Sequence, residues 1–183
     1  MIRDYELENY ISAFCVENGV SVNISRDMPD GYDTAYGTYD VTVNTLYLNF
    51  GKLENASEYE VLFYLFHELR HALQYLRPEM FDEQIRESSS YVVLYDGTCF
   101  KLIDHKWHRC YLDEVGNHFT DAYLSIPYEV DANRYAYQKV KIICGDSPEL
   151  RKLYQFWMPK TVWQYEDYRK LFLIIDGKIM SEV

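Results

Sequence analysis

The chain has 183 residues, 48% of them hydrophobic, and carries 29 acidic against 18 basic side chains, which gives a formal charge of −11. This hydrophobic content excludes a disordered chain, and the length suffices for one domain with a sizeable core. An acidic surface repels phosphate backbones and the basic residues do not cluster, so we expect no nucleic-acid partner.

The spacing of the cysteines and the lengths of the apolar runs predict the cellular compartment of the protein. The chain contains four cysteines, none of them in a CxxC pair: Cys15, Cys99, Cys110 and Cys144. Cys99 and Cys110 could face each other across a hairpin, but nothing else suggests a disulfide framework. The N-terminal residues lack the apolar stretch of a signal peptide, and no run approaches the roughly 18 apolar residues of a membrane span. We therefore expect a cytoplasmic protein with free thiols and no membrane partner.

The first part of the chain predicts a helix and then a strand. Residues 4–18 have helical apolar spacing, and Gly19 is a typical residue to end such a helix. Apolar and polar residues alternate at 20–24, which predicts a strand, and the Asp, Pro and Gly content of 27–36 predicts a loop.

Two further alternating runs follow, at 39–43 and 46–50. Only Asn44 and Thr45 separate them, so they predict a tight hairpin, although Asn-Thr is a weaker turn signal than Asn-Gly. If the 46–50 strand lies at the edge of its sheet, it could pair with an extended substrate segment.

A long helix is predicted over 57–77. Ser57 and Glu60 form a capping-box pattern at its start, and Pro78 ends it because the residue before proline is pushed out of the helical region. Apolar side chains recur along it at helical spacing and predict one buried stripe: Leu62, Leu65, Leu69, Ala72, Leu73 and Leu76.

This helix carries an HExxH motif formed by His67, Glu68 and His71. Residues four apart lie on the same face of a helix, so both imidazoles can bind one metal ion. The glutamate between them is then placed to take a proton from a metal-bound water. The alternative is an amphipathic helix whose histidines are merely packed or solvated.

The middle of the chain predicts a β-rich insertion at about 79–125. Residues 79–87 are polar and have a helical pattern, and Asp96-Gly97 is a strong hairpin signal. Three strands are predicted around this turn, at 91–95, 98–103 and 107–112. Residues 113–124 show no clear pattern.

A second long helix is predicted over 127–143, and it offers a third metal ligand. Glu129 and Asn133 are four apart and share a face with Ala132 and Ala136, whose small side chains allow close helix packing. Glu129 could then reach the metal, while Asn133 could hydrogen-bond the far nitrogen of a ligating histidine. Alternatively, Glu129 is an ordinary first-turn glutamate stabilised by the helix dipole.

The whole chain, 1–183, predicts a single α+β domain. The expected fold is a small, twisted, mostly antiparallel sheet packed on the HExxH helix, with the Glu129 helix behind it. The reason is that three strands run into the first long helix without alternating βαβ units. A short helix is expected after Pro148, and the aromatic run at 162–175 fits a helix or a strand.

The two helical motifs together resemble those of gluzincin metallopeptidases, in which an HExxH helix is followed by a helix carrying Glu-x-x-Ala-Asp/Asn. Residues 67–71 and 129–136 look most like the corresponding motifs of the small ImmA/IrrE-type enzymes, and the strand at 46–49 resembles the one that precedes their active-site helix. The likeness extends over about 40–140.

This resemblance implies a zincin-like fold and zinc-dependent hydrolysis of a peptide or protein substrate. It implies one zinc ion held by His67, His71 and Glu129, with Glu68 as the general base. The chain departs from the family pattern at Arg70, where a glycine is typical, and at 138–141, where Gln-Lys-Val-Lys replaces an apolar tail.

The sequence leaves the group that stabilises the oxyanion open. The candidates are tyrosines and histidines near the two motifs: Tyr128, Tyr135, Tyr137, His108 and His118. The spacing of His105 and His108 is more typical of surface residues than of a second metal site, and the absence of G-x-S-x-G argues against a serine nucleophile.

A different class of function also fits, namely a non-catalytic scaffold that binds a protein partner and holds a structural metal or none. A structural site would have a fourth protein ligand, and His108 or His118 could supply it.

Overall fold

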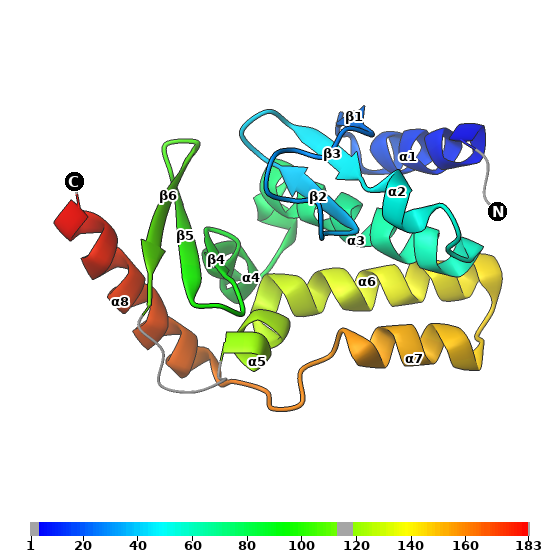
Figure 1. Cartoon of the computed structure of the whole chain (residues 1–183). Helices are drawn as coiled ribbons and strands as arrows, with labels where there is room; N and C mark the ends of the chain where they lie inside the picture. The colour runs from blue at the N-terminus through cyan, green and yellow to red at the C-terminus, as the bar shows by residue number, and fades with distance from the viewer. Residues whose placement is uncertain (1–3, 113–118, 183) are drawn as a thin grey trace. The chain divides into compact units, whose positions relative to one another are not determined.

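The computed structural model describes residues 4–112 and 119–182, which belong to two compact units (Figure 1). The first unit comprises Met1–Pro78 and Ala132–Phe156, and the second comprises Glu79–Asp131 and Trp157–Val183. Helices and small three-stranded sheets occur together, as expected for the α+β class. No described helix has both the length and the apolar character needed to cross a bilayer.

The sheet of the first unit consists of β1 (Asn23–Ser25), β2 (Gly37–Asp40) and β3 (Thr45–Leu48), in the order β1-β3-β2. β1 pairs with β3 in parallel orientation, and β2 pairs with β3 in antiparallel orientation. The run at 46–50 therefore lies in the centre of the sheet and is not an edge strand. It also ends early, because the short helix α2 (Phe50–Leu53) follows directly.

The predicted two-residue turn between β2 and β3 is wrong. Asp40 pairs with Thr45, so four residues form the turn, and the last of them, Asn44, has a φ of 48°. The Asp40 carboxylate accepts hydrogen bonds from the backbone N–H and the hydroxyl of Thr42, at 2.8 and 2.6 Å. Such side-chain bonds stabilise a local turn at the expense of the ladder, which the alternation of apolar residues does not reveal.

The HExxH motif lies in α3 (Glu58–Leu76), whose predicted capping box is present. The Glu60 carboxylate accepts from the Ser57 N–H at 2.8 Å. α3 packs against β2 and β3, and also against α1 (Asp4–Asn18). Its buried residues extend beyond the expected leucine stripe: Val61, Leu62, Phe63, Tyr64, Leu65, Phe66, Glu68, Leu69, His71, Ala72, Leu73 and Gln74. The helix is therefore enclosed on most sides, which restricts the side chains at its centre.

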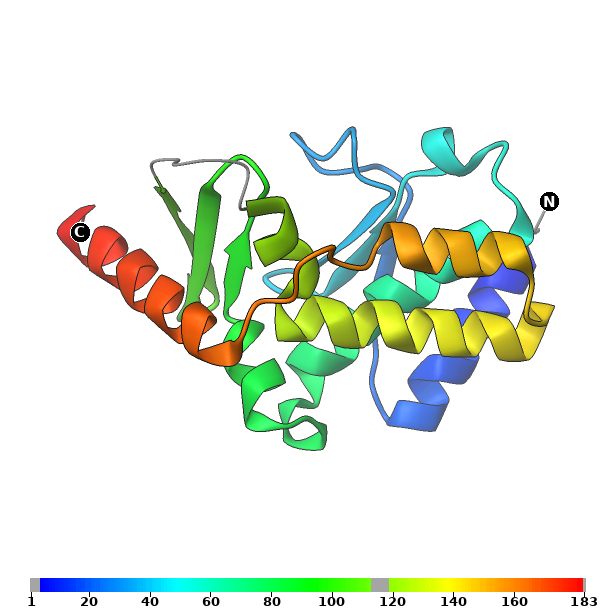
Figure 2. The ribbon, with the colours of Figure 1, turned by 90° about the horizontal axis from the view of Figure 1, so that it is seen from below.

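The second motif helix, α6 (Pro127–Cys144), matches its predicted range and runs beside α7 (Pro148–Phe156) in both views (Figures 1 and 2). The rings of Tyr137 on α6 and Tyr154 on α7 stack with centroids 4.5 Å apart. Gly145 forms the turn between the helices with a φ of 86°. The small and apolar residues of α6 are fully buried, as their spacing predicted: Ala132, Ala136 and Val140.

In the second unit, three strands form an antiparallel sheet in the order β4-β5-β6. Their bounds are β4 (Tyr91–Val93), β5 (Thr98–Ile103) and β6 (Lys106–Tyr111), and the helical elements before and after them are η1 (Pro78–Met80), α4 (Glu83–Ser88) and α5 (Phe119–Ser125). Cys99 lies directly opposite Cys110 across β5 and β6, and both side chains are buried. Burial, reinforced by the neighbouring Cys110, raises the pKa of Cys99 to about 12, so this thiol is unreactive near neutral pH.

The undecided run at 162–175 belongs to a helix, α8 (Tyr165–Glu182). One face of α8 packs on β5 and β6. Asp176 on this helix accepts from Lys101 Nζ at 2.5 Å and from the Tyr91 hydroxyl at 3.1 Å. The aromatic and apolar residues of this run therefore pack a helix on a sheet. Their pattern did not distinguish a helix from a strand, because either periodicity can bury such residues.

Candidate metal centre

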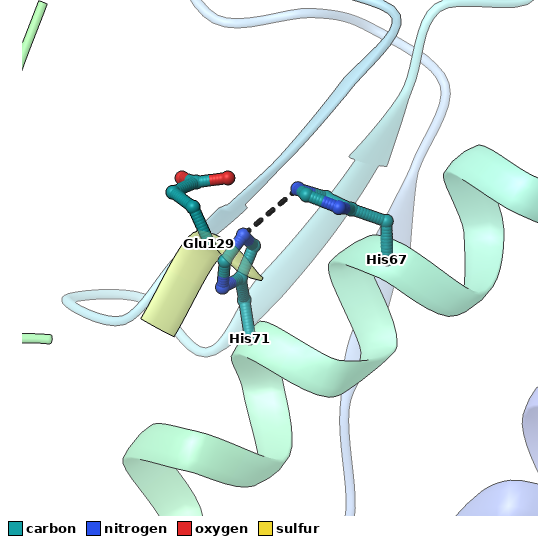
Figure 3. A group of neighbouring side chains, drawn as sticks. All are labelled: His67, His71 and Glu129. Carbon is teal, nitrogen blue, oxygen red and sulfur yellow. Dashed lines mark hydrogen bonds between the residues drawn. The ribbon is translucent and has the colours of Figure 1, made fainter. Parts of the chain in front are cut away.

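Two histidines form the centre of the candidate site. Helix α3 places His67 and His71 one turn apart on the same face, as Figure 3 shows. Their Nε2 atoms are 2.9 Å apart, and the two rings are nearly perpendicular, with an interplanar angle of 88°. The two nitrogens therefore point to the same small region of space, which is the arrangement that the HExxH spacing predicts.

Glu129 joins this pair from the first turn of α6, a helix whose residues from Ala132 onward belong to the first unit. Its side chain is buried, and the ligand atoms of Glu129, His67 and His71 all lie within 4.8 Å of one another (Figure 3). Within residues 4–112 and 119–182, this is the group of His, Cys, Asp or Glu side chains able to hold a metal ion. The three residues predicted as ligands are thus brought together.

The separations can be tested against a tetrahedral zinc site. With Zn–N distances of 2.0–2.1 Å, two ligand nitrogens are about 3.4 Å apart. The observed imidazole separation of 2.9 Å is slightly shorter, and the upper limit of 4.8 Å for the whole group is longer. Side-chain rotations that move each ligand atom by less than about 1 Å would bring these separations to the tetrahedral value. Two imidazoles and a carboxylate are also the ligands of a typical catalytic zinc site, so the residues present fit the metal.

Gln74 holds one of the imidazoles in place. Its side chain is 1% exposed, and its Oε1 lies 2.9 Å from His71 Nδ1. An amide oxygen only accepts, so Nδ1 of His71 carries the proton and Nε2 keeps its lone pair toward His67. Asn133, which was expected to hydrogen-bond a ligating histidine, is buried on α6. The spacing of three residues along α3 could have indicated Gln74 as a partner of His71.

We expect Gln74→Leu to weaken zinc binding about 10- to 100-fold, because it removes the acceptor that fixes the His71 tautomer. Competition with a chromophoric chelator measures this affinity. Gln84→Leu, at an exposed position of α4, is the matched control and should bind zinc like the wild type. Unchanged zinc affinity in Gln74→Leu would show that the hydrogen bond does not orient the ligand.

Glu68 lies beside the sheet. It is 7% exposed, and a Cβ atom placed on Gly37 of β2 would be only 3.0 Å from its Cγ. Burial raises the pKa of Tyr32 above its usual value, and the nearby charges of Asp40 and Glu68 add to this rise. Tyr32 lies in the loop before β2, and nothing in the sequence pattern indicated that its phenol would interact with the charge of Glu68.

The other predicted candidates are engaged elsewhere or are not described. The Tyr128 ring belongs to the hydrophobic core of the second unit. Tyr137 donates to Asp146 at 3.2 Å, and the Arg70 guanidinium lies 4.7 Å from the centroid of the Tyr135 ring. Arg70, the departure from the family glycine, thus contributes to packing on this ring.

Among the described residues, the other histidines do not extend the metal group. His105 lies in the β5–β6 turn with a φ of 60°, and His108 pairs with Lys101 on β5. Neither belongs to the His67, His71 and Glu129 group. His118, named as a possible donor or fourth ligand, lies outside the described residues.

Comparison of the chain with protein-family models, with curated proteins and with solved structures gives no match. The function of the chain is therefore inferred from its residues and from their geometry.

Proposed function

We propose that the protein is a zinc-dependent peptidase with a zincin-like fold. In this proposal His67, His71 and Glu129 hold one zinc ion, and Glu68 is the general base. The observation that carries the proposal is the convergence of two imidazole nitrogens and a carboxylate from two separate helices, all within 4.8 Å. The donor set favours zinc over calcium or magnesium, which prefer oxygen ligands alone.

Each residue of the proposed site has a separate role in the hydrolysis. Zinc bound at this site would lower the pKa of a coordinated water toward neutrality and polarise the substrate carbonyl. Glu68 accepts the proton from the attacking water and then delivers it to the leaving amine. Gln74 keeps His71 in the tautomer whose Nε2 faces the site. Burial of Glu68 and Glu129 restricts competing water, which strengthens the electrostatic interactions of the site.

The position of β2 at the edge of its sheet is an argument for a peptide substrate. The Asn49 N–H donates to the Tyr36 carbonyl, so residues 36, 38 and 40 bond toward β3. In an antiparallel ladder the alternate residues, Gly37 and Tyr39, then direct their N–H and C=O groups to the free edge. An extended peptide can pair with these groups, and this edge takes the role expected of the 46–50 strand. The formal charge of −11 favours neutral or basic substrates.

The cytoplasm is the compartment that we propose, on the grounds of the sequence. The four cysteines are widely spaced and form no CxxC pair, which is typical of thiols in a reducing compartment.

The proposal is tested on protein purified without added metal. Elemental analysis should find about one zinc ion per chain, as a three-ligand site requires. A library of fluorescence-quenched peptides should contain members that are cleaved, with activity lost on adding a chelator and restored by zinc. A chain that stays metal-free after zinc is supplied, with an unchanged melting temperature, overturns the proposal. Bound zinc without hydrolysis of any peptide would favour the protein-binding scaffold.

A further inference from the structure

A glycine occupies an unusual position beside the candidate site. Gly37 begins the edge strand β2 and pairs with Leu48 of β3. It is not among the residues with positive φ, so the backbone here does not require glycine. Glycine weakens a strand, and within a sheet it often marks a place where another group approaches closely. The question is which group approaches.

The distances identify the neighbours. A Cβ on Gly37 would lie 3.0 Å from Glu68 Cγ, 3.0 Å from the Tyr47 carbonyl oxygen and 3.3 Å from Leu48 Cδ2. Normal contacts between carbon atoms are about 3.5–4.0 Å, so an added methyl group would have to displace something. The Tyr47 carbonyl belongs to the central strand and is held by the sheet. Of the two groups at 3.0 Å, the Glu68 side chain is therefore the one able to move.

We propose that Gly37 is the positioning residue of the general base: its missing side chain leaves the space that the Glu68 side chain occupies beside β2. This inference rests on the proposed function. Both residues belong to the first unit, and Glu68 is adjacent in sequence to the ligand His67. A base acts only within hydrogen-bond reach of its proton, so a small displacement of its carboxylate is costly.

A double-mutant cycle on stability tests the contact without any activity assay. Gly37→Ala should lower the melting temperature by about 2–6 °C, since overpacking is destabilising. In a Glu68→Ala background the same substitution should cost less than about half of this shift, because the crowded side chain has been removed. An equal cost in both backgrounds overturns the proposal, since the Tyr47 carbonyl and the Leu48 side chain would then explain the glycine.

Kinetics test the consequence for hydrolysis. Gly37→Ala keeps the backbone groups of the strand edge, so KM for a cleaved peptide should be nearly unchanged. The zinc content should also stay the same, while kcat falls about 10- to 100-fold. Gly51→Ala is the matched control, because a Cβ there meets only an ordinary 3.5 Å contact with Asn49 Oδ1. It should leave kcat unchanged.

The outcomes separate the two proposals. Coupled melting temperatures together with a reduced kcat support the positioning role. Coupled melting temperatures with an unchanged kcat overturn it, although the peptidase remains. A zinc-loaded wild type that cleaves nothing refutes the proposed function and the catalytic role of Gly37 with it, while the cycle still reports whether Gly37 and Glu68 are in contact.

Discussion

Replacing His67, His71 or Glu129 by alanine is expected to abolish zinc binding and hydrolysis together. Each substitution removes one of the three side chains whose ligand atoms lie within 4.8 Å. The loss of affinity should exceed the 10- to 100-fold effect expected for residues that hydrogen-bond a ligand, such as Gln74. Zinc at about 100 times its dissociation constant should stabilise the wild type by about 2.7 kcal/mol, and this increment should disappear in all three variants. Thermal unfolding with and without zinc, combined with elemental analysis, measures both effects.

Asp131→Ala is the control for the carboxylate ligand. Asp131 is two residues from Glu129 on α6, and this spacing places it on another side of the helix. The variant should bind zinc and hydrolyse peptide like the wild type. If Asp131→Ala loses the metal while Glu129→Ala keeps it, the assignment of the third ligand is wrong.

Glu68→Gln is expected to separate metal binding from chemistry. Glutamine keeps the size and the helix propensity of glutamate, but its amide cannot accept the proton of the attacking water. The variant should fold and bind zinc with wild-type affinity, while kcat falls by about 10²- to 10⁴-fold. Zinc titration and peptide hydrolysis on the same preparation give the two values side by side.

The control for this substitution is Glu54→Gln, which makes the same chemical change at an exposed position. It should leave kcat unchanged. Full activity in Glu68→Gln would assign the base to another group. If the zinc-loaded wild type hydrolyses no peptide, and Glu68→Gln leaves the biological phenotype intact, the chain is a binding scaffold and not an enzyme.

The sequence was sufficient for features that depend on neighbours along the chain. Ser57 and Glu60 marked the start of α3 and Pro78 its end, and the structure has the helix at Glu58–Leu76. The spacing of His67 and His71 placed both rings on one face, because four residues make about one helical turn. The Asp96-Gly97 turn between β4 and β5 follows from local backbone chemistry in the same way.

Only the tertiary structure decided which distant elements meet. The sequence left open whether Glu129 is a ligand or an ordinary first-turn glutamate, and its approach to the histidines depends on how α6 packs. Strand order is equally non-local: β3 is central because β1 joins it from the side opposite β2, which no periodicity reveals. The contact of Gly37 with Glu68 is the clearest case. In the sequence, Gly37 is only a glycine before an alternating run. Apolar spacing determines which face of a helix or strand is buried, but not which other element packs against that face.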